Sequence, residues 1–448
     1  MSGLLALLLA CSRSAGPNLL MISVDTLRAD HLGAYGYARP TSPNIDKLAT
    51  EGQRFTRVLS PRGATRPALM TVQTSLPPVL HGVRQNSAIG KEGLPTLATL
   101  LTSQGYQTAA ILANAGELAW PGFAQQVAIK RAPRDPATTN EAIAILEKAK
   151  APFYVWVHLM APHAPYDEHP GEADFRDPHY TGPIDGSNRS LLAGMSDAPA
   201  LTPADLDQIR ARYDAEVAHA DQQVGRLLGA LDHSGHRADT LVVFTADHGE
   251  QLGTPAPYLY HFASGYNAVL HVPLILSQPG HIPVGVATET VALQDLAPTI
   301  ADLLGIPAPT TWMGRSLRPA FSGGDLPDLP AISEVETGAL VATRDIWAYS
   351  YNPQNKGYEF APIQNYQEEG LALVPPRLRM PHRSLWRLDQ DPTQTTPVED
   401  ATVKAQLEED LRGFIAKTGW PGTMDRAPVP PELREQLQKL GYVEGPAH

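Results

Sequence analysis

The sequence predicts an α/β protein with a parallel sheet at its centre and a smaller antiparallel sheet near the carboxyl end. Short apolar runs with the length of buried strands alternate with helical segments that stop at glycine, which is typical of a doubly wound sheet. Beyond residue 338, apolar and polar residues alternate, as in antiparallel strands with one solvated face. The chain has 448 residues, of which 43% are hydrophobic, so it can bury a large core.

The first predicted strand, Leu19–Val24, is apolar and ends abruptly at Asp25. Ligand sites of parallel sheets gather beyond the carboxyl ends of the strands, so Asp25 is predicted to lie where a metal ligand belongs. A helix over 42–52 follows, and a strand over 55–60 leads into the loop before Thr65.

Thr65 is followed by Arg66, Pro67 and a helix-forming run. This pattern predicts Thr65 as the N-cap of a helix, where its hydroxyl accepts hydrogen bonds from the first turn and Pro67 is tolerated. The position also suits a nucleophile that attacks a phosphate or sulfate ester, because a helix N-terminus presents N–H donors and a positive dipole to an anion. The residues around Thr65 do not decide between a cap and a nucleophile.

The segments after Thr65 continue the alternation of helices and strands. His158 lies in a predicted strand, and His163 lies in the loop into which that strand runs. Residues 167–201 are rich in Asp, Gly, Pro and His, and we expect a long surface loop there that covers the site. The other predicted elements of this part are a helix over 94–105, a strand over 106–114, a helix over 141–150, a strand within 152–166 and a helix over 202–231.

A later strand, over 240–247, also ends in an acidic residue, because Asp247 and then His248 follow its apolar run. Asp247 therefore repeats the position of Asp25 at the end of a strand. Downstream, the sequence predicts a strand over 272–280, a helix over 293–305, a linker over 322–330, antiparallel strands within 339–352, 358–363 and 384–392, and a helical tail from about residue 402.

The single cysteine, Cys11, follows the apolar run MSGLLALLLA, and the segment LLAC resembles a lipoprotein signal. No Lys or Arg precedes Arg13, unlike in a typical signal peptide, and the run is too short to span a bilayer. We expect cleavage before Cys11 and lipidation of its thiol; the alternative is a simple hydrophobic N-terminal fragment. Because Ser12 rather than aspartate follows Cys11, the resemblance implies an outer-membrane anchor, with the body in the periplasm or at the cell surface.

Three parts are therefore expected along the chain. Residues 1–17 form a lipoprotein signal and tether, 18–322 an α/β metal-dependent hydrolase domain, and 331–448 a small α+β subdomain. A net charge of −12 without a basic cluster argues against nucleic-acid binding. Contact with a membrane is expected only through the N-terminal lipid.

A series of stretches resembles the sulfatase family of the alkaline-phosphatase-like superfamily through its order and spacing. The resemblance implies an α/β sandwich with a central, mostly parallel sheet and a smaller C-terminal antiparallel sheet domain. It also implies a divalent metal at the carboxyl ends of the strands and a covalent intermediate on one side chain. The matching stretches are VDTLRADHLGAYGY, SPNIDKLATEG, PHAPY, RYDAEVAHADQQVGRLL, FTADHGE, VPLI, DLAPTIADLLGIP with GRSL, LDQDPTQTTPV and LQKLGYVEG.

Asp25, Asp247 and His248 align with metal ligands of that family. Two carboxylates and an imidazole suit one divalent ion, of which Mn, Zn, Ca and Mg are all candidates. Each residue alone is equally compatible with a capped turn. Asp232 and His236 have the spacing of ligands in two-metal phosphodiesterases, but they precede a strand at its amino end and are interpreted as surface turn residues. One firmly held metal is therefore expected.

The nucleophile position departs from true sulfatases, whose formylglycine is made from Cys or Ser in the motif Cys/Ser-X-Pro-Ser-Arg. Here the five positions hold Thr65, Arg66, Pro67, Ala68 and Leu69. Threonine cannot become formylglycine, and the serine and arginine of the motif are missing. Thr65 instead resembles the threonine of phosphodiesterases and of phosphoglycerol and phosphoethanolamine transferases in the superfamily. The resemblance implies that Thr65 is metal ligand and nucleophile together.

Other departures concern substrate binding. Thr26 replaces the second aspartate of the N-terminal sulfatase pair, and Ala113 and Ala115 stand where sulfatases carry a Lys and a His. Two sulfate-binding charges are therefore missing. Asn114 lies between the two alanines and is either a substrate contact or a turn residue.

Three histidines complete the candidate site. His163 in PHAPY aligns with a histidine that contacts the ester or the leaving group, and we expect it to act as the general acid. His158 is predicted either to bind substrate or to be only a packed histidine of its strand. His261 falls in the variable segment after DHGE, where relatives often carry a residue that faces the substrate.

These residues favour a metal-dependent hydrolase that cleaves a phosphate ester, preferably a diester, through a covalent Thr65 intermediate. The expected substrate is a small molecule or a glycan or lipid ester. Alternatives within the class are a sulfuric ester hydrolase without formylglycine and a phosphoryl transferase, although known transferases of this type carry membrane helices. The alternative of another class is a catalytically degenerate protein that binds a metal or glycan at the cell surface.

Overall fold

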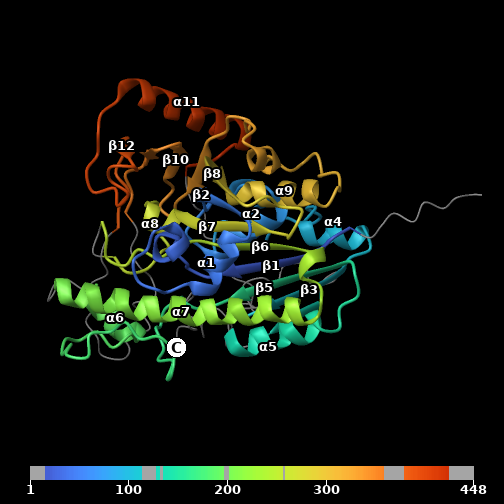
Figure 1. The fold of residues 1–448 in the computed structure, drawn as a ribbon. Coiled ribbons are helices and arrows are strands. Elements are labelled where there is room, and N and C mark those ends of the chain that lie inside the picture. Colours follow the sequence, from blue (N-terminus) through green and yellow to red (C-terminus); the bar gives the residue numbers. More distant parts are fainter. Residues whose placement is uncertain are drawn as a thin grey trace, which may run out of the picture.

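The computed structural model describes residues 16–113, 128–131, 135–195, 201–255, 258–357 and 378–422. An eight-stranded sheet runs through the larger part of the molecule, with strand order β4-β3-β5-β1-β6-β7-β2-β8 (Figure 1). Neighbouring strands are parallel except at β7, which runs antiparallel to β6 and β2. Its strands are β1 (Asn18–Val24), β2 (Gln53–Leu59), β3 (Gln107–Leu112), β4 (Ala128–Arg131), β5 (Phe153–Leu159), β6 (Thr240–Ala246), β7 (His271–Ser277) and β8 (Gly285–Ala292).

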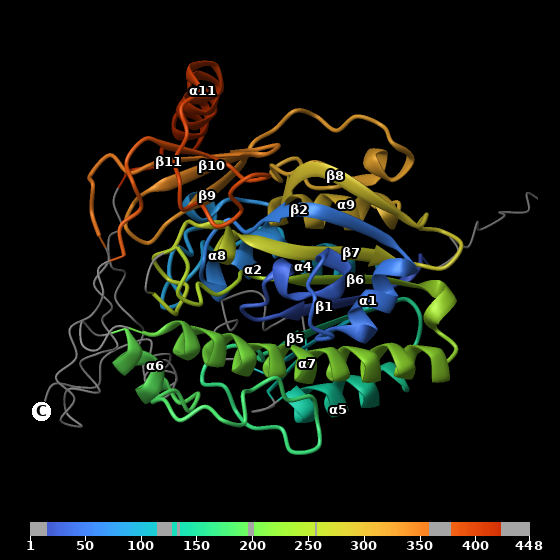
Figure 2. The ribbon, with the colours of Figure 1, turned by 60° about the vertical axis from the view of Figure 1, so that its left-hand side comes forward.

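The three central strands β1, β5 and β6 are buried along their whole length because helices cover both faces of the sheet. Figure 2 shows α5 and α7 beneath the sheet, and α1 packs on the same side against α7, while α2, α4 and α9 pack together on the other side. The helices are α1 (Pro43–Thr50), α2 (Thr65–Thr74), α3 (Pro78–His81), α4 (Leu97–Ser103), α5 (Asp135–Leu146), α6 (Asn188–Gly194), α7 (Pro203–His233), α8 (Asn267–Leu270), α9 (Leu296–Leu303) and α11 (Ala401–Thr418). Within the described ranges, none of these helices is both long and apolar enough to cross a membrane.

The long helix α7 begins where the sequence predicts. Thr202 is its N-cap and forms a capping box with Asp205. Farther along α7, the carboxylate of Asp221 accepts hydrogen bonds from the N–H groups of Asn44 (3.0 Å) and Ile45 (2.8 Å) in the first turn of α1. The start of α1 is thus satisfied by a side chain about 175 residues away, which joins the two helices.

A second, antiparallel sheet follows the predicted 322–330 linker, with strand order β12-β11-β10-β9. Leu407 and Leu411 of α11 pack on this sheet against Leu340 and Tyr349. The Arg84–Glu334 ion pair (2.8 Å) ties it to the larger part of the chain. Its strands are β9 (Ala331–Glu334), β10 (Leu340–Arg344), β11 (Trp347–Tyr351) and β12 (Ser384–Arg387). The predicted strand over 358–363 and the tail beyond residue 422 lie outside the described residues, and the limits 18–322 and 331–448 stay predictions.

Three local expectations need correction. The N-cap of α2 is Ala64, whereas Thr65 is the first helical residue, so the prediction that Thr65 caps the helix is wrong. The predicted loop over 167–201 contains the short helix α6, which Ser187 caps through the N–H of Ser190. The sheet-edge strand β8 was not predicted, because its run GVATETVA is half polar and partly exposed.

Candidate active site

The register of the large sheet brings the two predicted carboxylate ligands together. β1 and β6 are parallel neighbours in which Val24 pairs with Ala246, and each strand continues directly into an aspartate. Asp25 and Asp247 are both fully buried at the carboxyl edge of the sheet. The pairing of two strand ends therefore places two carboxylates side by side, as the sequence predicts.

The unprotonated ring nitrogen of His248 faces these carboxylates. Its Nδ1 lies 3.0 Å from the Gly249 carbonyl, which can only accept, so Nδ1 carries the proton. Nε2 then presents a lone pair 3.3 Å from Asp247 Oδ2 and 3.9 Å from Asp25 Oδ1. Burial lowers the pKa of His248 to about 3, which keeps the ring neutral. A lone pair that faces carboxylate oxygens repels them unless a cation lies between.

These three residues fit a divalent metal. One donor atom from each of Asp25, Asp247 and His248 lies within 4.8 Å of the others. Oδ2 of Asp247 is buried and accepts no hydrogen bond from the described residues, although Oδ1 accepts one from the His248 N–H (2.8 Å). Burial disfavours the charged form of the Asp247 carboxylate and raises its pKa to about 6. A cation bound beside it would favour the charged form. Carboxylate oxygens suit Mg²⁺, Mn²⁺ and Ca²⁺, whereas imidazole nitrogen suits Zn²⁺.

Thr65 lies at the same point, at the start of α2. Its Oγ1 is 3.3 Å from Asp25 Oδ2 and 3.4 Å from His248 Nε2. The first turn of α2 is held by Asn86, whose Oδ1 accepts from the Arg66 N–H at 3.0 Å. The hydrogen bonds of the Thr65 hydroxyl go to Asp25 and His248, so it is directed at the ligand cluster and not at its own helix.

Three imidazoles extend the site away from the carboxylates. The His261 ring lies 4.4 Å from that of His248 and 5.4 Å from that of His163. Nδ1 of His261 is 3.1 Å from Glu250 Oε1, while its Nε2 is buried without a hydrogen bond to a described residue. Burial lowers the pKa of His261 to about 3 and raises that of Glu250 to about 8. His261 thus lies in the site and has a ring nitrogen available for a ligand.

The comparisons with known proteins identify the family and the fold of this chain. The family model described as Sulfatase matches residues 17–306, which is well over half of the chain. The chain belongs to the sulfatase family. The curated relative N-acetylgalactosamine-6-sulfatase of Canis lupus familiaris is 25% identical over 441 residues, covering 87% of this chain and 83% of that protein. Membership confirms the predicted fold class and the prediction of an ester hydrolase.

Solved structures share the fold of this sulfatase-family chain. The phosphonate monoester hydrolase of Agrobacterium radiobacter superposes with a TM-score of 0.69 at 22% identity, covering 90% of this chain and 96% of that one. A 2-O GAG sulfatase superposes with a TM-score of 0.71 at 19% identity, covering 93% and 96%. At these identities the likeness shows the fold, which is the predicted one.

His158 of this family member lies behind Asp25. Its Nε2 is 3.5 Å from Asp25 Oδ2, and its Nδ1 is 2.9 Å from the Ser23 hydroxyl, which also accepts from Trp156 Nε1. Burial lowers the pKa of His158 to about 4. The structure therefore places His158 where it positions a predicted metal ligand, while a contact with substrate stays a prediction.

His163 follows β5 and is half-buried beside His261. Its N–H donates to Met160 O (2.9 Å), and its Nδ1 donates to Ala164 O (2.6 Å). The carbonyl of Ala164 thus fixes the orientation of the His163 ring beside His261. Burial lowers the pKa of His163 to about 4.

Two residues at the site have roles that the sequence alone did not indicate. The phenol of Tyr213, on α7, donates to Thr26 O (2.7 Å) and accepts from the Arg28 N–H (2.9 Å). It thereby fixes the turn in which the Thr26 N–H donates to Asp247 Oδ1 (3.2 Å) and Thr26 has a φ of 54°. The other residue is Glu250. Its position three residues after Asp247, in a loop at a strand end, is the one signal that could have found it.

The remaining predicted positions lie elsewhere. Asn114 and Cys11 fall outside the described residues, so both assignments stay predictions. Asp232 is exposed at the end of α7, and His236 lines a hollow of about 1050 Å³ on the opposite, amino side of the sheet. Both lie away from the ligand cluster, as expected, although Asp232 belongs to the last turn of α7 and not to the turn that follows it.

Proposed function

We propose that this hydrolase cleaves a phosphate diester and that the Thr65 hydroxyl is the nucleophile. The observation that carries the proposal is the position of Thr65 Oγ1, 3.3 Å from Asp25 Oδ2 and 3.4 Å from His248 Nε2. Threonine cannot be converted to formylglycine, and Ala68 and Leu69 replace the motif residues that direct that modification. The attacking group is therefore an unmodified alcohol.

The charge of the site favours a substrate with a single negative charge. Burial lowers the pKa of His158, His248 and His261 to about 3 or 4, so these three rings are neutral near pH 7. A phosphate monoester carries nearly two charges at that pH, which such a site neutralises poorly. Diesters and sulfate esters carry one. Since the sulfatase modification motif is missing, the diester is the better fit.

The chain's own residues account for the steps. The Thr65 hydroxyl donates toward Asp25 and attacks phosphorus, so that an Oγ1–P bond forms as the bond to the leaving oxygen breaks. His163 Nε2, when protonated, delivers a proton to that leaving oxygen. Water then attacks the phosphorus of this threonine phosphodiester, which still carries the second ester group; the Oγ1–P bond breaks, a phosphate monoester leaves and the alcohol is restored. A divalent ion held by Asp25, Asp247 and His248 would lower the pKa of the nearby hydroxyl and offset charge on the non-bridging oxygens.

The comparisons support two substrate classes. A structural neighbour is named a phosphonate monoester hydrolase, so this fold acts on phosphorus esters in that protein. The curated relative is named a sulfatase, which favours a sulfate ester as the second candidate, cleaved without formylglycine.

Initial rates on matched aryl esters distinguish these candidates. We expect kcat/KM for bis(4-nitrophenyl) phosphate to exceed that for 4-nitrophenyl sulfate and 4-nitrophenyl phosphate by at least about tenfold, equivalent to about 1.4 kcal/mol in the transition state. Mass spectrometry of the peptide that contains Thr65 should show an unmodified threonine. A wide preference for the sulfate would contradict the proposal and favour the second candidate.

Substitution of His163 by glutamine should slow cleavage according to the leaving group. General acid catalysis contributes about 10²- to 10⁴-fold, and poor leaving groups need the proton most. We expect a large loss of kcat with phenyl esters and a small loss with 4-nitrophenyl esters. In the wild type, a bound anionic substrate favours the protonated form of His163. The pKa that limits kcat should therefore be higher than the pKa that limits kcat/KM. Each kinetic parameter should fall as the pH rises past its own pKa. Equal losses for both leaving groups would rule out this role.

A further inference from the structure

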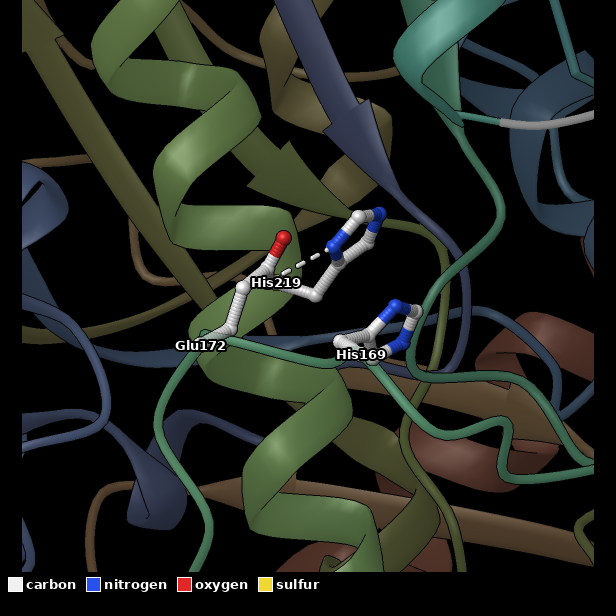
Figure 3. A group of neighbouring side chains, drawn as sticks. All are labelled: His169, Glu172 and His219. Atoms are coloured by element: carbon white, nitrogen blue, oxygen red, sulfur yellow. Dashed lines mark hydrogen bonds and ion pairs between the residues drawn. The ribbon is translucent and has the colours of Figure 1, made fainter.

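A second cluster of metal-binding side chains lies between α7 and the loop that follows β5 (Figure 3). His169 and Glu172 come from the loop and His219 comes from α7, and one donor atom of each lies within 4.8 Å of the others. None of the three belongs to the active-site cluster. We propose that His169, Glu172 and His219 bind a second divalent ion, of the zinc type.

Two residues of the loop and two residues of α7 face each other at this cluster. His169 and Glu172 are three residues apart in a turn that the Glu172 N–H closes by donating to His169 O (3.1 Å). Glu216 and His219 are three residues apart on α7 and therefore share one face of the helix. His219 Nδ1 lies 2.9 Å from Glu172 Oε2, and His169 Nε2 lies 3.0 Å from Glu216 Oε2. Each histidine thus faces a carboxylate of the opposite element.

The donor set indicates the class of metal. Imidazole nitrogen with carboxylate oxygen suits zinc and similar transition ions, whereas an all-oxygen set would suit calcium or magnesium. Two histidines and one glutamate give three protein ligands, and Glu216 is the nearest further donor. The site is therefore chemically different from the active-site cluster, which has two carboxylates and one imidazole.

The donor atoms of this cluster must move slightly closer together to bind an ion. Zinc–ligand bonds of about 2.0–2.1 Å separate tetrahedral donors by roughly 3.3 Å, which is less than the 4.8 Å limit of this cluster. The rings of His169 and His219 stack at 3.8 Å with 7° between their planes. Lone pairs of parallel rings do not converge, so the loop histidine must rotate away from the stack. The loop side of the cluster can move in this way because the His169 and Glu172 side chains are 17% and 22% exposed.

The α7 side of the cluster is the fixed half. Glu216 and His219 are only 3% and 5% exposed, and Glu216 Oε1 also accepts from the Asp167 N–H. A hollow of about 270 Å³, lined by His169, Glu172 and neighbouring loop residues, gives an ion access from solvent. The bound ion would fasten the loop to α7 a few residues beyond His163 and so stabilise this part of the fold.

The test is metal stoichiometry in the full chain, independent of activity. The protein is stripped with chelator, dialysed against Zn²⁺ and analysed for bound metal, and Co²⁺ is used in parallel to record the spectrum of a histidine-containing site. We expect two ions per chain in the wild type and one in His169→Ala. His179→Ala, which removes an exposed histidine from the same loop, should keep both. Because His169 lies on the exposed side, its removal should leave the circular dichroism unchanged; His219→Asn serves as a second variant.

Each outcome decides the proposal. Loss of one ion in His169→Ala and His219→Asn but not in His179→Ala supports it, as does Zn²⁺-dependent thermal stabilisation that these two variants lose. Binding of the same number of ions by the wild type, His169→Ala and His219→Asn overturns it. Asp247→Asn should keep the second ion, so failure of the active-site assignment and failure of this one give different results.

Discussion

Replacement of Thr65 by alanine should reduce kcat for bis(4-nitrophenyl) phosphate by at least about 10³-fold, because loss of a nucleophile costs up to about 10⁶-fold in a hydrolase. Thr65→Ser keeps an alcohol at the same carbon and should retain activity within about tenfold, which is about 1.4 kcal/mol. The measurement is steady-state kinetics, with acid quenching of the wild type to trap a 4-nitrophenyl phosphoryl group on the peptide that contains Thr65.

The substitution of Thr65 by alanine should change catalysis without destabilising the fold. The hydrogen bonds of the Thr65 hydroxyl go to the ligand cluster and not to its own helix, and alanine is the best helix former at a helical position, so Thr65→Ala should unfold at nearly the wild-type urea concentration. A variant that stays folded, keeps its metal and retains full diesterase activity would exclude the Thr65 intermediate. Activity in the serine variant alone would instead establish the alcohol as the reacting group.

The strands and the ligand cluster were predictable for a local reason. Asp25 and Asp247 each follow an uninterrupted apolar run, and a buried strand that stops at a carboxylate can be recognised without knowledge of its neighbours. Parallel pairing of β1 with β6 then brings the two together. His248 follows from adjacency to Asp247. These parts of the site needed only the order of elements and the rule for strand ends.

Other parts depend on contacts between distant segments. The start of α2 was mispredicted by one residue because a threonine before a helix is usually a cap. The contact of the Thr65 hydroxyl with Asp25 joins segments 40 residues apart. Tyr213 reaches the Thr26 turn from a helix 187 residues away. The pairing of His169 with His219 likewise joins a loop to a helix. No sequence spacing encodes such contacts, which the packing of α7 against the sheet creates.

Substitution of Asp247 by asparagine should remove the active-site metal and, with it, most activity. Asparagine keeps the shape and one acceptor for the N–H groups of Thr26 and His248, which bond to Oδ1. It cannot supply the negative charge of Oδ2, which accepts no hydrogen bond from the described residues. We expect metal affinity to fall at least about 100-fold, since loss of a residue that only holds a metal ligand in place already costs about 10- to 100-fold. Equilibrium dialysis and kcat/KM against added metal measure both effects.

Asp239→Asn is the matched control, because Asp239 is exposed just before β6, at the opposite end of the same strand. It removes the same charge and should leave metal content and activity unchanged. Excess Mn²⁺ or Zn²⁺ should partly restore the Asp247 variant, since weaker binding is overcome by mass action, but should not restore Thr65→Ala. That difference separates loss of the metal from loss of the nucleophile. Normal metal content with lost activity in Asp247→Asn would show that Asp247 acts otherwise than as a ligand.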